Sequence, residues 1–105
     1  METTPKTPTA AYSESQLTAL IIDIEMRKDK NGQDYWRIYT QIDADNKPIY
    51  LAFSQDYNLA PAARSLLTNY PHRLVNSQVL LTLRKKAELT KVINLAIIPQ
   101  EKPPL

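Results

Sequence analysis

An all-β domain with one helix is the fold class that the sequence predicts, and three observations support it. Five segments of strand length are rich in apolar residues, and in the first three of them apolar and polar residues alternate with a period of two. Turn-forming residues separate these segments, and only one segment repeats its apolar residues at helical spacing. The length of 105 residues and the 43% hydrophobic content fit one domain with a single core.

The first predicted strand covers residues 17–28 and is followed by a tight turn. Its alternation creates two faces, with Leu20, Ile22, Ile24 and Met26 on one and Ile21, Asp23, Glu25 and Arg27 on the other. Asn31-Gly32 then predicts a hairpin, because both residue types tolerate positive φ. This is the only glycine of the chain, and it stands where a tight turn needs one.

The second and third predicted strands cover residues 34–43 and 49–54, with a turn at residues 44–48. The second strand has Trp36, Ile38, Thr40 and Ile42 on one face and Tyr35, Arg37, Tyr39 and Gln41 on the other. The third has Ile49, Leu51 and Phe53 on one face and Tyr50 and Ala52 on the other. We interpret Trp36 as a core residue; a register slip by one residue would instead expose Trp36 and bury the tyrosines.

A helix is predicted from about Leu59, with Asp56 or Asn58 as its N-cap and Pro61 in its first turn. Its end is expected before Pro71, because the residue that precedes a proline is disfavoured in the helical region. Two more strands are predicted at residues 77–84 and 91–98, with residues 85–90 as their connection. The predicted order is therefore β-β-β-α-β-β.

The folded unit is expected to cover residues 16–98, between a disordered N-terminal tail at residues 1–15 and a Pro-rich C-terminal tail at residues 99–105. No segment approaches the roughly 20 apolar residues that a membrane-spanning helix needs. The start of the chain lacks the apolar run of a secretory signal. A soluble cytoplasmic protein is expected, without a membrane partner.

Composition argues against most catalytic and cofactor chemistry. The chain has no Cys, one His and one Gly, so thiolate metal sites, histidine clusters and Gly-rich phosphate loops are excluded. No acid and base are arranged around His72 in a way that suggests a hydrolase. We expect a protein that is not an enzyme and that uses no metal and no small-molecule cofactor.

The order of elements resembles the oligonucleotide/oligosaccharide-binding (OB) fold, a five-stranded Greek-key barrel. Small bacterial single-stranded DNA-binding and primosomal proteins are similar in size and in element order. The resemblance implies an OB-like barrel whose ligand lies outside strands two and three, between the loops that join strands one to two and four to five. OB barrels commonly coil their first strand at a glycine; this strand has none, so a β-bulge must bend it.

Charge and aromatic residues fit that geometry. The net charge is only +2, but residues 59–105 hold seven Lys and Arg against two Asp and Glu. Seven of the thirteen basic residues fall at the two expected loops: Arg27, Lys28, Lys30, Arg84, Lys85, Lys86 and Lys91. The expected stacking residues are Tyr35, Tyr39 and Tyr50, with Arg37 between the first two. Bases stack on aromatic rings while Lys and Arg follow the phosphates, so we expect binding of single-stranded nucleic acid, with DNA favoured over RNA.

Each of these features also has a plain structural interpretation. Outward tyrosines on a strand often serve cross-strand packing, and a basic hairpin often keeps a sheet edge soluble. Tyr57 could pack against the start of the helix, and His72 is expected at the surface. The main alternative function is a protein-interaction module or homodimer, because Ile21 and alternate residues of the last two strands could form an apolar outer face. If the fold is a different small barrel, or a sheet crossed by the helix, the two basic loops are not expected on one surface and the argument based on them does not apply.

Overall fold

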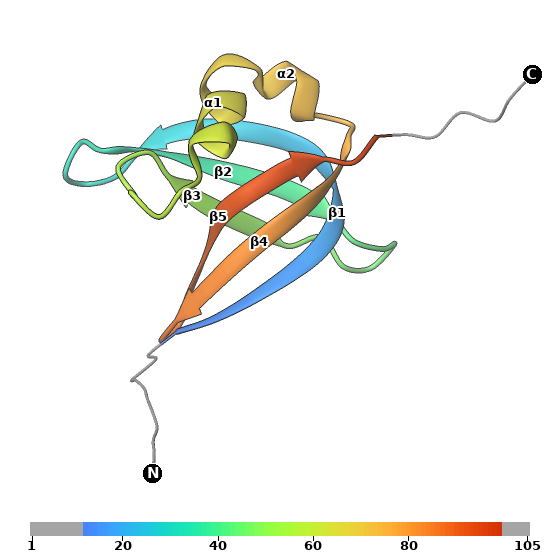
Figure 1. Cartoon of the computed structure of the whole chain (residues 1–105), viewed down its shortest axis with the longest axis horizontal. Coiled ribbons are helices and arrows are strands. Elements are labelled where there is room, and N and C mark those ends of the chain that lie inside the picture. The colour runs from blue at the N-terminus through green and yellow to red at the C-terminus, as the bar shows by residue number, and fades with distance from the viewer. Residues whose placement is uncertain (1–11, 100–105) are drawn as a thin grey trace, which may run out of the picture.

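The structure, a computed structural model, describes residues 12–99. Its elements are β1 (Tyr12–Lys28), β2 (Asp34–Gln41), β3 (Ile49–Phe53), α1 (Pro61–Asn69), α2 (Pro71–Leu74), β4 (Gln78–Lys86) and β5 (Leu89–Ile97). The five strands close into one ring in the order β1-β2-β3-β5-β4, and the two helices lie together at one end of it (Figure 1). The prediction of a mostly β domain with five strands is confirmed, whereas the second helix, α2, was not predicted.

The first strand is longer than predicted and is bent by a β-bulge. Residues 12–20 pair with β4, so the strand starts four residues before the expected folded unit, in what was expected to be tail. The register with β2 shifts between Ile21 and Asp23, as the absence of glycine in this strand required. The rest of both predicted tails, residues 1–11 and 100–105, lies outside the described residues.

The bulge reverses which residues of β1 face the core. Ala19 and Ile21 are buried before it and Ile24 packs on the core after it, whereas Met26 is 53% exposed. Ile21 was expected as an outward residue, and that expectation is wrong. Its backbone is also held, because Asn76 N–H donates to Ile21 O at 2.7 Å and Ile21 N–H donates to Ser77 O at 3.0 Å.

The second strand ends at Gln41, and within it the predicted faces are confirmed, whereas Ile42, expected on the inner face, lies beyond its end and is exposed. Trp36, Ile38 and Thr40 are buried, so the prediction that Trp36 belongs to the core is confirmed. The predicted faces of the third strand are reversed: Ala52 is buried and Tyr50 packs against the core, while Ile49 is exposed. The pairing explains this result, because Ala52 lies opposite Trp36 and leaves room for the large indole inside the ring.

The helical segment differs from the prediction at its start. Helix α1 begins at Pro61, two residues after Leu59, and its N-cap residue is Ala60, without a side-chain cap, so neither Asp56 nor Asn58 caps it. The helix ends at Asn69, before Pro71, as predicted. Ala60 N–H donates to Ile93 O at 2.7 Å, which fixes the start of α1 on β5.

The last two strands form a tighter hairpin than predicted. Only Ala87 and Glu88 separate β4 from β5, and Ala87 adopts a φ of 56°. The β4–β5 register shifts next to Ile93, so Val92 and Ile93 are both buried. This bulge and the adjoining helix account for apolar residues in both phases of β5. No helix within residues 12–99 is long and apolar enough to span a membrane.

Candidate functional site

The outer face of β1, β2 and β3 presents nine side chains in three cross-strand rows, and we call this array the outer face. The register gives the rows as Asp23, Tyr39 and Ile49, then Glu25, Arg37 and Leu51, then Arg27, Tyr35 and Phe53. The array therefore changes from charged residues on β1, through aromatic and cationic residues on β2, to apolar residues on β3. A planar group can stack on the aromatic side chains of β2 and β3, whereas the carboxylates of Asp23 and Glu25 on β1 repel anions.

Hydrogen bonds and ring contacts order the aromatic side chains of this face. Tyr39 OH donates to Glu25 Oε1 at 2.8 Å, and Arg27 Nε donates to the same oxygen at 3.1 Å. The Tyr39 and Arg27 hydrogen bonds lower the pKa of Glu25, and the bond to Glu25 raises the pKa of Tyr39. The guanidinium carbon of Arg37 lies 5.5 Å from the centre of the Tyr39 ring. Glu25 is thus held ionised, and Tyr39 is held in place.

The structure brings together three of the four residues predicted on the strands and separates the fourth. Tyr35, Arg37 and Tyr39 share the outer face, whereas Tyr50 points to the core, where burial raises the pKa of its hydroxyl. Phe53 takes the place expected for Tyr50, with its ring centre 5.9 Å from that of Tyr35 and an angle of 34° between the rings. The sequence places Phe53 on the face opposite Tyr50, and in the structure it is Phe53 that lies on the outer face, because Ala52 pairs with Trp36 on the inner one.

The predicted basic residues lie mostly on strand ends rather than in loops, and four of the seven face a carboxylate. The pairs are Arg27 with Glu25, Lys28 with Asp34, Arg84 with Glu14, and Lys91 with Asp56, at 2.6–3.1 Å. Within residues 12–99, Lys30, Lys85 and Lys86 make no ion pair with a carboxylate. The positive charge available to a ligand is therefore smaller than the residue count suggests.

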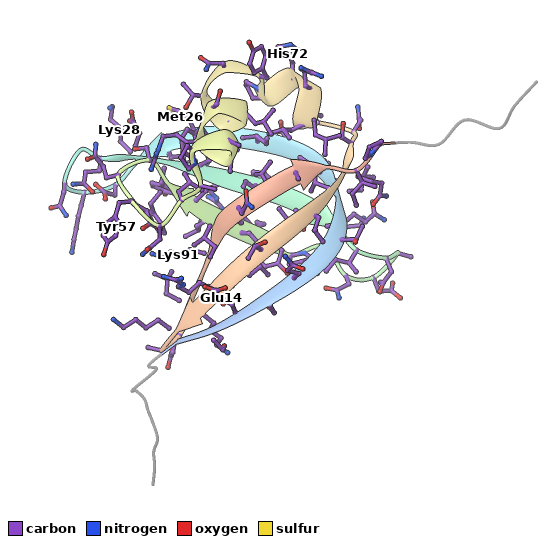
Figure 2. All side chains as sticks on the ribbon, viewed as in Figure 1. Glu14, Met26, Lys28, Tyr57, His72 and Lys91 are labelled. Atoms are coloured by element: carbon purple, nitrogen blue, oxygen red, sulfur yellow. The ribbon has the colours of Figure 1, made fainter. Side chains whose placement is uncertain are left out.

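The loop between β3 and α1 lies between the two basic hairpins. At its start, Ser54 N–H and Oγ donate to Asp34 O, which ties it to the β1–β2 hairpin. Two residues later, Asp56 Oδ2 lies 2.7 Å from Lys91 Nζ on β5. In Figure 2, Tyr57 of this loop accordingly lies at the edge of the molecule between Lys28 and Lys91.

The ion pair between Asp56 and Lys91 is largely shielded from solvent, since the two side chains are 9% and 22% exposed. Burial raises the pKa of Asp56, but Lys91 and the backbone N–H of Asn58 outweigh it, so the pKa is lowered overall. The Arg64 guanidinium donates to Asp56 O at 2.7 Å and links the same loop to α1. Lys91 is consequently engaged within the fold, and the phosphate contact expected of it stays a prediction.

A second aromatic–cation contact lies at the helical end, where the Arg73 guanidinium carbon is 5.8 Å from the centre of the Tyr70 ring. In the described part of the chain, no group of three or more His, Cys, Asp or Glu side chains could hold a metal ion. His72 is exposed on α2, where its ring meets that of Tyr70 edge-on at 6.3 Å. Comparisons with protein-family models, with curated proteins and with solved structures found no match. A functional proposal for this chain is therefore based on the geometry of the outer face.

Proposed function

We propose that this chain is an OB-like Greek-key barrel that binds single-stranded nucleic acid, DNA in preference to RNA, without catalysing a reaction. The supporting observation is the group of outer-face side chains on β2 and β3, in which the Tyr35 ring lies against that of Phe53 and Arg37 lies over the Tyr39 ring. Each base that stacks on such a ring contributes about 1–3 kcal/mol to the binding free energy, whichever base it is. The expected ligand is therefore a flexible strand with unpaired bases.

The charges around the face give the bound strand an orientation. Asp23 and Glu25 are expected to repel phosphates from the β1 side of the outer face. Lys85 and Lys86, near the end of β4, are cations without a carboxylate partner among the described residues. We therefore place the phosphates on the side of β3 and the β4–β5 hairpin, with the bases directed toward the β2 rings.

A titration of labelled oligonucleotides, followed by fluorescence anisotropy at two salt concentrations, tests this function. Affinity should fall steeply with salt, because neutralised phosphates release condensed counterions. Replacing both Lys85 and Lys86 by Gln should reduce the slope of log K against log salt by about 1.4, at roughly 0.7 per phosphate contact on a single strand. Tyr35→Ala should weaken binding about fivefold or more. Absence of binding by the wild-type chain at low salt would refute the proposal.

Tyr70→Ala is the matched control for Tyr35→Ala. Tyr70 is also an exposed tyrosine with a nearby cation, since the Arg73 guanidinium carbon lies 5.8 Å from its ring centre. It belongs to the helical end of the molecule rather than to the outer face. Its replacement should leave the affinity unchanged, so an equal loss in both variants would argue against stacking on β2.

A second candidate function is association of two copies through the opposite sheet surface. Outward side chains of β1, β4 and β5 form two rows without charge: Thr18, Leu80 and Ala96, then Gln16, Thr82 and Asn94. Charged residues are depleted at the centres of protein interfaces, and Leu80 is 36% exposed here. Sedimentation of the wild type beside Leu80→Lys tests it: a dimer that the substitution dissociates would support the idea, and a wild-type monomer at high concentration would exclude it.

A further inference from the structure

Tyr57 is the most exposed large hydrophobic side chain of the described residues. Its exposure is 91%, so it is not packed against the start of the helix, as the sequence allowed. An aromatic side chain left in water contributes little to folding, since its burial would bring favourable free energy that the fold does not use. The position therefore calls for an explanation outside the stability of the chain.

The backbone that carries Tyr57 is tightly held. Asp56 N–H donates to Phe53 O at 3.1 Å, and Leu59 N–H donates to Asp56 O at 3.0 Å, so two turns follow each other. Asp56 Oδ1 accepts the N–H of Asn58 at 3.0 Å, and Asp56 Oδ2 is paired with Lys91. The residues on both sides of Tyr57 are thus fixed, and an exposed ring is presented from an ordered support.

The position of this support matches the outer face. The loop begins directly after Phe53, whose ring contacts Tyr35, and it lies between the β1–β2 and β4–β5 hairpins. Figure 2 shows the Tyr57 side chain extending outward between Lys28 and Lys91. A single-stranded nucleic acid that extends from the rings of Tyr35 and Phe53 along the side of β3 would meet Tyr57 next.

We propose that Tyr57 is a further stacking residue, which receives a base of the single strand beyond Tyr35 and Phe53. This inference depends on the proposed function and extends its ligand site beyond the two strands. Because the backbone on both sides of Tyr57 is already held, the loop loses little backbone entropy on binding, which favours affinity. The hydroxyl has no assigned role, because stacking uses the ring face alone.

The test compares Tyr57→Ala, Tyr57→Phe and the control Tyr70→Ala in the oligonucleotide titration. Tyr57→Ala should weaken binding about fivefold or more, as expected for loss of one stacked base. Tyr57→Phe should bind like the wild type, and the salt slope should be unchanged in all three because none alters a charge. Unfolding curves of Tyr57→Ala and the wild type should coincide, since the side chain is almost fully exposed.

A Tyr57→Trp variant gives a direct readout, because a stacked base quenches the emission of an exposed indole, while Trp36 is buried in the core. Quenching that saturates with the same affinity as the anisotropy signal would support the inference. If the wild type binds and Tyr35→Ala weakens binding but Tyr57→Ala does not, the inference is wrong and the proposed function stands. If the wild type binds no oligonucleotide, the proposed function and this extension of it both fail.

Discussion

Replacing Asp56 by Asn removes one charge from the ion pair that fastens the β3–α1 loop to β5. The amide keeps an oxygen for the N–H of Asn58, so the main loss is the counter-charge of Lys91, whose side chain is 22% exposed. Breaking an exposed pair costs up to about 1 kcal/mol, and breaking a fully buried one about 3–5 kcal/mol. The exposures of 9% and 22% place this pair between those limits. We expect the free energy of unfolding to fall by about 2–3 kcal/mol.

Urea unfolding at pH 7 measures this change, with Trp36 as the fluorescent probe because the only tryptophan of the chain is buried. A domain of this size should lose about 4–8 °C in Tm for each kcal/mol. A second substitution, Lys91→Met, in the same chain should restore much of the stability, because it removes the isolated charge. A difference below about 0.5 kcal/mol between Asp56→Asn and the wild type would show that solvent screens the pair.

The pH dependence of the same variant gives an independent check. The pKa of Asp56 is lowered in the folded state, so its carboxylate stabilises the fold fully above the ordinary Asp pKa of about 3.9. That contribution is lost as the pH falls through the lower pKa of the folded chain. The stability difference between wild type and Asp56→Asn should therefore be constant from pH 7 to about pH 5 and then shrink toward zero in acid. A difference that persisted unchanged in acid would contradict the assigned cause.

Two further substitutions test how the hairpins are held. Thr40→Val should lower the free energy of unfolding by about 1–2 kcal/mol, because buried Thr40 Oγ1 donates to Pro48 O at 2.7 Å and valine cannot; an unchanged urea midpoint would show that this bond contributes nothing. Gly32→Ala should cost about 1 kcal/mol, since Gly32 has a φ of 82° and an added Cβ meets no atom within 4 Å. A much larger loss by thermal unfolding would indicate crowding in the turn.

Alternation of residue types was sufficient to predict β2 but not its two neighbours. In β2 the inward side chains Trp36 and Ile38 are also the most hydrophobic, so hydrophobicity and pairing agree. In β3 they disagree, because the register with β2 places Ala52 opposite Trp36 and leaves Phe53 outside. In β1 the bulge after Ile21 breaks the period, and the backbone of Ile21 is hydrogen-bonded there to Asn76 and Ser77. Such contacts are distant in sequence and are invisible to a local pattern.

The candidate site, like the strands, could be predicted from the sequence only in part. Tyr35, Arg37 and Tyr39 follow from the phase of β2 alone, and the structure places them together on the outer face. The pairing of the basic residues was not predictable, because Arg84 meets Glu14 across 70 positions of the chain. The prediction of a loop between β4 and β5 also failed, since the strands continue to a two-residue turn. Charge counts by segment therefore overstated the free positive charge.

Closure of the ring has a consequence for how the chain reaches its fold. Gln16 of β1 donates a hydrogen bond to Thr82 of β4 across 66 positions, and β5 must also be in place to complete the order β1-β2-β3-β5-β4. Contacts this far apart in sequence slow folding, because the entropy of loop closure is lost before they form. During synthesis the first half of β1 therefore lacks its partner strand until β4 has left the ribosome. Until then the edge of β1 is exposed, and this is the stage of folding at which the strand can most easily pair with a wrong partner.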